Sequence, residues 1–169
     1  MNFFTLFDLP ETLDVDKAKL SATYQVLQQL THPDKFSTGS DQEKRIALQK
    51  NSQVNDGYSV LKAPLARAQH LLSLRGVDIK DEQHTMQDTT FLMQQMEWRE
   101  ELEDAQNDED ALWQFHIDVT KTIQSEYSQL TDLFDAHADI NILANAVRKL
   151  TFMYKFQEQV QQHLDKFED

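Results

Sequence analysis

The sequence predicts an all-α protein, and three features carry that prediction. Glycine and proline occur only three times each among 169 residues, so few positions interrupt a helix. Apolar residues recur at spacings of three and four along most of the chain, which is the period of an amphipathic helix, and strand-like alternation is scarce. The composition, 40% hydrophobic and 27% charged, is ordinary for a folded protein. The length is sufficient for one sizeable domain or two small ones.

The amino-terminal segment predicts a short apolar element followed by a longer helix. Residues 3–7 are apolar and precede Pro10, so we expect a short helix or turn that packs on later helices. The next helix begins after Asp14 or Asp16, since either side chain can cap it. One face of that helix is apolar and consists of Leu20, Tyr24 and Leu27.

His32 and Pro33 end this helix, because proline lacks an N–H and disfavours the α conformation in the residue before it. Residues 37–40 predict a loop, with Ser40 as the N-cap of a second helix. The apolar face of the second helix consists of Ala47, Val54, Tyr58 and Leu61. Pro64 ends it, and the two helices can lie antiparallel with the aromatic amino terminus over their open side.

A further short helix covers residues 65–72, and Gly76 suits its carboxyl-terminal cap. The polar, poorly periodic stretch after it predicts a packed connection rather than a flexible tether, because it is not rich in Gly and Ser. We therefore assign residues 1–75 to a first domain, 76–87 to a connection and 88–169 to a second domain.

The second domain predicts a bundle of three amphipathic helices with short connections. Asp88 caps the first, over residues 89–106, and residues 107–110 form a turn that leads into an acidic first turn of the next. Apolar positions of the middle helix are Leu112, Phe115, Val119, Ile123, Tyr127, Leu130 and Phe134. Those of the last are Ile140, Leu143, Val147, Leu150 and Tyr154, with Val160, Leu164 and Phe167 beyond.

Charge is unevenly distributed and argues against several partners. Residues 1–75 are nearly neutral, whereas residues 76–169 hold seven basic and twenty-one acidic residues, a net charge of −14. Such a surface repels phosphate backbones and anionic lipid, so we expect no nucleic-acid or membrane binding and favour a basic protein partner. The alternative is that the acidic helices only keep the protein soluble. With no cysteine, no signal-like amino terminus and no membrane-length apolar run, we expect a cytoplasmic protein without thiolate metal sites.

The sequence His32-Pro33-Asp34-Lys35 at the corner of the predicted hairpin is the most informative motif. An acid–base pair for catalysis needs a nucleophile and a water-excluding cleft, which a hairpin tip does not promise. Two interpretations remain: the exposed side chains recognise a partner, or the motif is an ordinary turn that ends a helix. The tripeptide His32-Pro33-Asp34 with its helical flanks resembles the J-domain, through which co-chaperones stimulate ATP hydrolysis by DnaK-type chaperones. Residues 54–58 in the second helix add to this resemblance. That resemblance favours recognition.

The rest of the chain is similar to one J-protein family, the HscB-type co-chaperones of iron–sulfur cluster assembly. The similarity is carried by residues 65–68, 71–76, 91–93, 97–102 and 148–152. It implies an L-shaped protein in which a J-domain packs against an acidic three-helix bundle. It also implies that the J-domain engages the dedicated chaperone HscA, and that the bundle binds the cluster scaffold IscU. The absence of an amino-terminal cysteine cluster favours a bacterial type.

The resemblance also implies the residues of each site. The chaperone-binding element would be His32, Pro33, Asp34 and Lys35. The scaffold-binding surface would be Leu92, Met93, Met96, Glu97, Glu100, Asp104 and Phe152. The apolar members are equally suited to a bundle core, but helix 89–106 carries more apolar residues than one face can bury, so some must be exposed.

Two features depart from the usual J-domain pattern. Gln25, Gln28 and Gln29 occupy much of the helix face that is usually basic, so we expect weak electrostatic steering and a modest salt dependence. Gly57 stands where the family tends to place alanine, which costs up to about 1 kcal/mol of helix stability.

Other function classes find little support. The six histidines show no i, i+4 pair, and no Glu-x-x-His motif suggests a di-metal bundle, so we expect no metal, no cofactor and no enzymatic activity. A histidine phosphotransfer domain is disfavoured because neither His116 nor His137 is followed by the Lys-Gly pattern of such domains. The remaining alternative is a J-domain adaptor that serves a different client.

Overall fold

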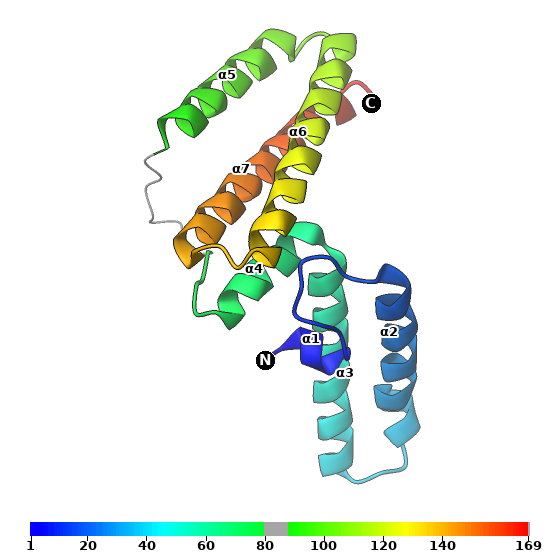
Figure 1. The fold of residues 1–169 in the computed structure, drawn as a ribbon. Helices are drawn as coiled ribbons and strands as arrows, with labels where there is room; N and C mark the ends of the chain where they lie inside the picture. Colours follow the sequence, from blue (N-terminus) through cyan, green and yellow to red (C-terminus); the bar gives the residue numbers. More distant parts are fainter. Residues whose placement is uncertain (80–87, 169) are drawn as a thin grey trace. The chain divides into compact units, whose positions relative to one another are not determined.

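The computed structural model describes residues 1–79 and 88–168, and in that part of the chain it contains seven α-helices, one short 3-10 helix and no strand. The all-helical prediction is confirmed. The helices are α1 (Phe3–Leu6), α2 (Lys17–Thr31), α3 (Asp41–Lys62), α4 (Pro64–Leu74), α5 (Thr89–Ala105), α6 (Glu109–Asp135) and α7 (Ile140–Asp165), and the 3-10 helix η1 is Pro33–Phe36 (Figure 1). Within the described residues, none of the helices combines the length and apolarity that a membrane span requires.

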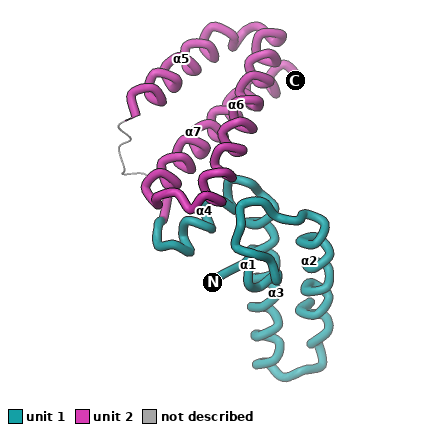
Figure 2. The backbone as a smooth tube through the Cα atoms, viewed as in Figure 1, with its two compact units in different colours: residues 1–77 teal, residues 78–169 magenta. Residues whose placement is uncertain are grey.

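Two compact units divide the chain, Met1–Val77 and Asp78–Asp169 (Figure 2). We call them unit 1 and unit 2. Most of the connection expected at 76–87 lies outside the described residues.

Side chains of aspartate and serine begin most of the helices. Asp16 rather than Asp14 caps α2 by accepting a hydrogen bond from the Lys19 N–H, and Ser40 caps α3 as expected. Asp88 caps α5 in the same way, also as expected. These caps satisfy amide groups that the first turn of a helix leaves without a partner, so the polar residues that precede each apolar run fix where the helices begin.

Gly76 ends α4 in the left-handed conformation, with a φ of +88°. Its N–H donates to the carbonyl of Ser73 at 3.0 Å, and the Val77 N–H donates to the carbonyl of Leu72 at 3.0 Å. This pair of bonds is the Schellman motif, which closes a helix where a residue without a Cβ can adopt a positive φ. The expected cap is therefore confirmed.

In unit 1, α2 and α3 form an antiparallel hairpin, and α1 and α4 pack on α3 (Figure 1). The apolar face includes buried Leu20, Val54 and Leu61. A polar seam crosses the hairpin, since the Tyr24 hydroxyl lies 2.6 Å from Asn55 Oδ1, while the Tyr24 and Tyr58 rings stack at 4.0 Å.

Gly57 lies where α1 meets α3. A Cβ added there would come within 2.9 Å of ring carbons of both Phe3 and Phe7. The sequence indicated only that glycine lowers helix stability at this position. The structure shows why glycine is suited to it: without a side chain, the aromatic segment can lie directly against the helix.

Arg67 is the buried charged residue of unit 1, with 4% of its surface exposed. Its Nε donates to the carbonyl of Leu13 and its Nη1 to the carbonyl of Leu61, each at 2.6 Å. One guanidinium thus joins α4 to the end of α3 and to the loop before α2. Charge-assisted bonds of this kind are stronger than neutral ones, so Arg67 holds three segments that are distant in sequence.

Unit 2 is built on the long antiparallel pair of α6 and α7 (Figure 1). Their predicted apolar positions are buried or half-buried, except that Phe167 lies beyond the end of α7 and is 40% exposed. The helix ends at Asp165, so the prediction that Phe167 continues the apolar face is wrong.

Helix α5 attaches to this pair through aromatic rings. The Trp98 centroid lies 5.4 Å from that of Phe156 and 6.4 Å from that of Phe115. Phe91, closer to the start of α5, meets Phe152 edge to face at 5.5 Å. Such contacts bury large apolar areas in defined geometries, which fixes the face that α5 turns inward.

Candidate partner-binding sites

The tip of the hairpin in unit 1 presents His32 and Asp34. Helix α2 ends at Thr31, and His32 takes an extended conformation with φ −61° and ψ 130°, as a residue before proline should. Pro33 then starts η1, a turn too short to be recognised in the sequence. Both polar side chains stay accessible, with 49% of the His32 side chain and 92% of the Asp34 side chain exposed.

Local contacts order this tip internally. His32 Nδ1 accepts a hydrogen bond from the Asp34 N–H at 3.2 Å, so the imidazole caps η1. With Nδ1 engaged, Nε2 is the ring nitrogen left for a partner. The Lys35 N–H donates to the His32 carbonyl at 3.1 Å, and the Lys35 side chain is exposed. The element is therefore short, rigid and available for recognition.

The exposed helix face before the tip is uncharged rather than basic. Val26 and Leu30 of α2 are 56% and 60% exposed, and Gln25 and Gln29 lie in the open beside them. Lys19 is drawn toward the loop after α1, because its Nζ donates to the carbonyl of Asp8 at 2.8 Å. No dense basic stripe precedes the tip.

In unit 2, α5 turns a mixed apolar and acidic face outward. Leu92, Met93 and Met96 are 44%, 57% and 61% exposed, opposite the inward-facing Phe91 and Trp98. The carboxylates of the expected site are exposed on the same helix: Glu97, Glu100 and Asp104. The apolar surplus of this helix therefore does not all enter the core. We call Leu92, Met93 and Met96 the outward face of α5.

Phe152 does not lie on the outward face. It is half-buried on α7, and its ring packs against Phe91 and, at 6.2 Å, against Trp98. Since both of those rings are buried on the inner side of α5, Phe152 belongs to the layer beneath the helix. Its packing fixes the height and angle at which α5 presents its outward residues.

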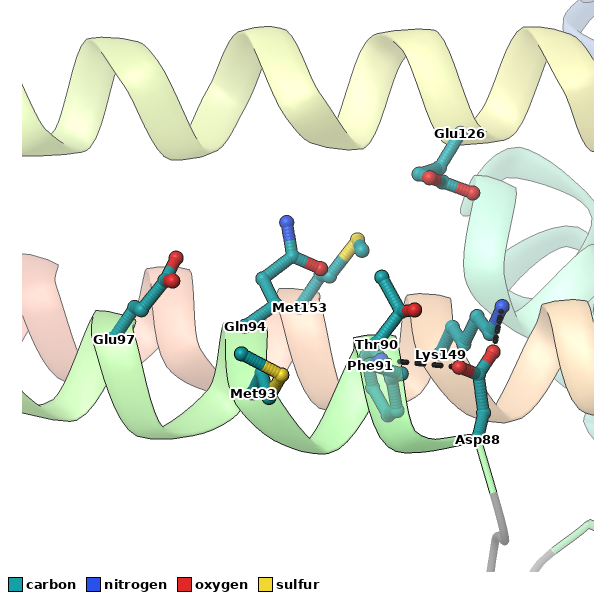
Figure 3. Close-up of a pocket in the computed structure, with 9 residues that line it drawn as sticks. All are labelled: Asp88, Thr90, Phe91, Met93, Gln94, Glu97, Glu126, Lys149 and Met153. Atoms are coloured by element: carbon teal, nitrogen blue, oxygen red, sulfur yellow. Dashed lines mark hydrogen bonds and ion pairs between the residues drawn. The ribbon is translucent and has the colours of Figure 1, made fainter.

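A pocket of about 410 Å³ opens between α5, α6 and α7 (Figure 3). It is lined by Asp88, Thr90, Phe91, Met93, Gln94, Glu97, Glu126, Lys149 and Met153. Thr90, Gln94 and Glu97 point into it from α5, and Glu126 points into it from α6 (Figure 3). Met93 belongs to both the pocket and the outward face, so the two are continuous.

An ion pair closes one end of the pocket. Lys149 Nζ lies 2.7 Å from Asp88 Oδ2 and 5.9 Å from the centre of the Phe91 ring. The bond from Lys149 and a second one from the Phe91 N–H lower the pKa of Asp88 below its usual value. Asp88 thereby joins the start of α5 to α7. Among the described residues, no group of three or more His, Asp or Glu side chains is placed to hold a metal ion.

Comparisons with known proteins agree with this architecture. Residues 87–161 match a family model described as the HSCB C-terminal oligomerisation domain. The chain is 52% identical to a co-chaperone protein HscB homolog of Pseudoalteromonas atlantica, over 100% of this chain and 99% of that protein. The chain belongs to the HscB family of co-chaperones.

Solved structures extend the similarity to both units. Chaperone HscB from Vibrio cholerae superposes with a TM-score of 0.84 at 38% identity, covering 98% of this chain and 99% of that one. Human co-chaperone protein HscB superposes with a TM-score of 0.90 at 31% identity, covering 96% of this chain and 81% of that one. Unit 1 thus has the J-domain fold, and unit 2 has the helical fold of the family's carboxyl-terminal domain.

The sequence predicted where the tip and the exposed apolar residues of α5 lie in this HscB-family chain, but it did not indicate most of the pocket. Glu126, Lys149 and Met153 occupy ordinary positions of amphipathic helices, and nothing in their local sequence marks them. They come together only because α6 and α7 pair along their length, and α5 lies against them to complete the pocket. The spacing of Asp88 and Lys149 in the chain gives no hint of their ion pair.

Proposed function

We propose that this co-chaperone stimulates ATP hydrolysis by a dedicated DnaK-type chaperone, HscA, and delivers the iron–sulfur scaffold protein IscU to it. The observation that supports this proposal is the presence of two exposed recognition surfaces on different units. One is polar, His32 to Lys35 in unit 1, and the other is apolar with an acidic rim on α5 in unit 2. The polar surface is suited to the chaperone, and the apolar surface with its acidic rim is suited to the scaffold.

The proposed role needs no reaction by the chain itself. The hairpin tip binds the ATP-bound chaperone and favours its hydrolysis-competent state, which is how a binding partner accelerates a step that it does not catalyse. The outward face of α5 holds the scaffold, with apolar contact from Leu92, Met93 and Met96 and a carboxylate rim for basic residues. Both partners are then held on one chain, which raises their effective concentration and aids cluster transfer. We place this activity in the cytoplasm, and in the proposed mechanism the co-chaperone holds no cofactor of its own.

Steady-state ATP hydrolysis by the HscA-type chaperone, with and without the scaffold, tests the proposal. We expect the wild-type chain and the scaffold to stimulate synergistically. His32→Gln should abolish the stimulation, whereas His137→Asn, a change of an exposed histidine in unit 2, should preserve it. Leu92→Ala with Met96→Ala should remove the scaffold's contribution and leave stimulation by the co-chaperone alone.

Another exposed apolar pair of unit 2 supplies the matched control. Ile117 and Ile142 are 44% and 52% exposed, so Ile117→Ala with Ile142→Ala removes similar apolar surface away from α5. This control should retain synergy. Stimulation that is indifferent to His32 would refute the chaperone half of the proposal. Stimulation that requires His32 but shows no scaffold binding would indicate a different client.

A further inference from the structure

A series of side-chain hydrogen bonds runs between α2 and α3 toward the hairpin tip, the end where the two helices are joined (Figure 1). The Tyr24 hydroxyl donates to Asn55 Oδ1 at 2.6 Å, and Asn55 Nδ2 donates to Asn51 Oδ1 at 3.2 Å. Asn51 Nδ2 then donates to Gln28 Oε1 at 2.8 Å and to Thr31 Oγ1 at 3.2 Å, which uses both of its hydrogens. Hydrogen bonds joined in this way polarise one another, so the series is ordered as a unit.

Asn51 is the member of the series that fixes the end of α2. Thr31 is the last residue of that helix and directly precedes His32. The Thr31 hydroxyl also donates to the Leu27 carbonyl at 2.7 Å, so the bond from Asn51 holds it from a second side. Because Pro33 has no N–H, the backbone bonds of α2 cannot continue past His32. A side chain of α3 therefore restrains the last turn from which the tip extends.

Apolar packing gives this end of the hairpin less support than the other end. Of the residues that the structure describes in α2 and η1, Leu20 alone is buried, and it lies near the start of α2. The buried residues of α3 lie mostly beyond Asn51, away from the tip, with Ala47 on the tip side. The hydrogen bonds of Asn51 thus act where few buried apolar contacts fix the two helices against each other.

We propose that Asn51 is a positioning residue for recognition of the chaperone. It holds the end of α2 against α3 and thereby sets the direction in which His32 presents Nε2. The inference rests on the proposed function, because the chaperone is the partner that binds the tip. A tip that changes its orientation binds through the fraction of molecules in the competent orientation. The apparent affinity falls with that fraction, whereas the complex, once formed, is the same.

ATP hydrolysis by the HscA-type chaperone, titrated with the full-length chain, tests this role. Asn51→Ala removes the bonds to α2, and alanine favours a helix more than asparagine does, so unit 1 should stay folded. We expect the concentration that gives half-maximal stimulation to rise about threefold to tenfold, the effect of losing one ordinary hydrogen bond. Maximal stimulation at saturation should be retained. His32→Gln, in contrast, should lose the stimulation at every concentration.

A threonine of unit 2 supplies the matched control. Thr120 Oγ1 accepts from Gln157 Nε2 of another helix and donates to the His116 carbonyl, each at 2.8 Å, which is the pattern of Thr31. Thr31→Val should raise the half-maximal concentration as Asn51→Ala does, and Thr120→Val should leave it unchanged. Asn51→Ala combined with Thr31→Val should exceed either change only slightly, because both remove the same bond.

An unchanged half-maximal concentration in Asn51→Ala, an equal rise in Thr120→Val, or a fall in maximal stimulation would overturn the positioning role. Far-UV circular dichroism at the assay temperature checks that Asn51→Ala is folded, and if it is not, Thr31→Val decides in its place. Failure of the proposed function has a different signature: the wild-type chain gives no stimulation, or His32→Gln stimulates as wild type does.

Discussion

Gly57 lies in the middle of α3, where alanine is the stronger helix former by about 1 kcal/mol. Against this gain, a methyl group would press on Phe3 and Phe7, and Phe7 is fully buried. Overpacking of a tight contact costs about 1–3 kcal/mol. We therefore expect Gly57→Ala to lower the free energy of unfolding of unit 1 by about 1 kcal/mol.

Urea unfolding followed by far-UV circular dichroism is the suitable measurement, because Trp98 and Trp113 both lie in unit 2 and do not report on unit 1. Gly39→Ala is the control. Its added Cβ would meet Glu43 Oε2, the end of a flexible exposed side chain that can move away. A Gly57→Ala variant more stable than wild type would show that helix propensity dominates at this position.

His70 links the amino terminus to α4 through a bond that requires its neutral form. Its Nε2 accepts a hydrogen bond from the Phe3 N–H at 3.1 Å, and its ring lies 5.6 Å from that of Phe4. Burial lowers the pKa of His70 below its usual value of 6.5, the positive amino terminus lowers it further, and Glu11 opposes this shift. Protonation would remove the acceptor.

The sign of the pH effect follows from that lowered pKa. The unfolded chain takes up the proton near pH 6.5 and the folded chain only at lower pH, so the stability of unit 1 is full above pH 6.5 and falls below it. We expect unfolding free energies measured at about pH 7.5 and 5.5 to differ less in His70→Gln than in wild type. Exposed His137, changed to asparagine, should leave the wild-type difference intact. An unchanged pH profile in His70→Gln would contradict this account.

At the scale of single elements, the start of α5 depends on Asp88. Its carboxylate caps the helix by accepting from the Phe91 N–H at 3.1 Å and also pairs with Lys149. Asp88→Asn keeps an oxygen for the cap and loses the charge, whereas Asp88→Ala loses both contacts. We expect the thermal midpoint of unit 2 to decrease in the order wild type, Asp88→Asn, Asp88→Ala.

Tryptophan fluorescence can follow this unfolding, since Trp98 packs between α5 and α7. The matched control is Asp108→Asn. Asp108 caps α6 through the Ala111 N–H, and no lysine pairs with it among the described residues, so the amide should replace it with little loss. Equal midpoints for Asp88→Asn and wild type would mean that the ion pair does not hold α5 in place.

The positions of the helices were more predictable from the sequence than which residues of each helix are buried. Most helix starts could be read from the sequence because a cap is a local event, and Ser40 and Asp88 act through backbone groups three residues away. The 3-10 turn η1 could not, because four residues carry no periodicity. On α5 the surplus of apolar residues indicated that some are exposed, but which ones depends on rings supplied by α6 and α7. The pocket is tertiary in origin and left no local pattern.

At the scale of the whole molecule, the proposed function requires both surfaces on one chain. His32→Gln leaves the outward face of α5 intact, and Leu92→Ala with Met96→Ala leaves the hairpin tip intact. If each surface acted independently, an equimolar mixture of these two full-length variants would restore synergistic ATP hydrolysis. If one chain must tether the scaffold beside the chaperone, the mixture should fail at concentrations well below the effective concentration of a tethered pair, which is on the order of millimolar.

The decisive comparison is the mixture against wild type at equal total concentration of each intact surface. We expect the wild-type chain and the scaffold to stimulate hydrolysis synergistically. We expect the mixture to give only the stimulation that the variant with Leu92→Ala and Met96→Ala gives alone. The His32→Gln chain should also compete for the scaffold, so adding it in excess to wild type should reduce the synergy. A mixture as active as wild type would mean that the scaffold and the hairpin tip reach the chaperone separately, and that joining the two units in one chain serves another purpose.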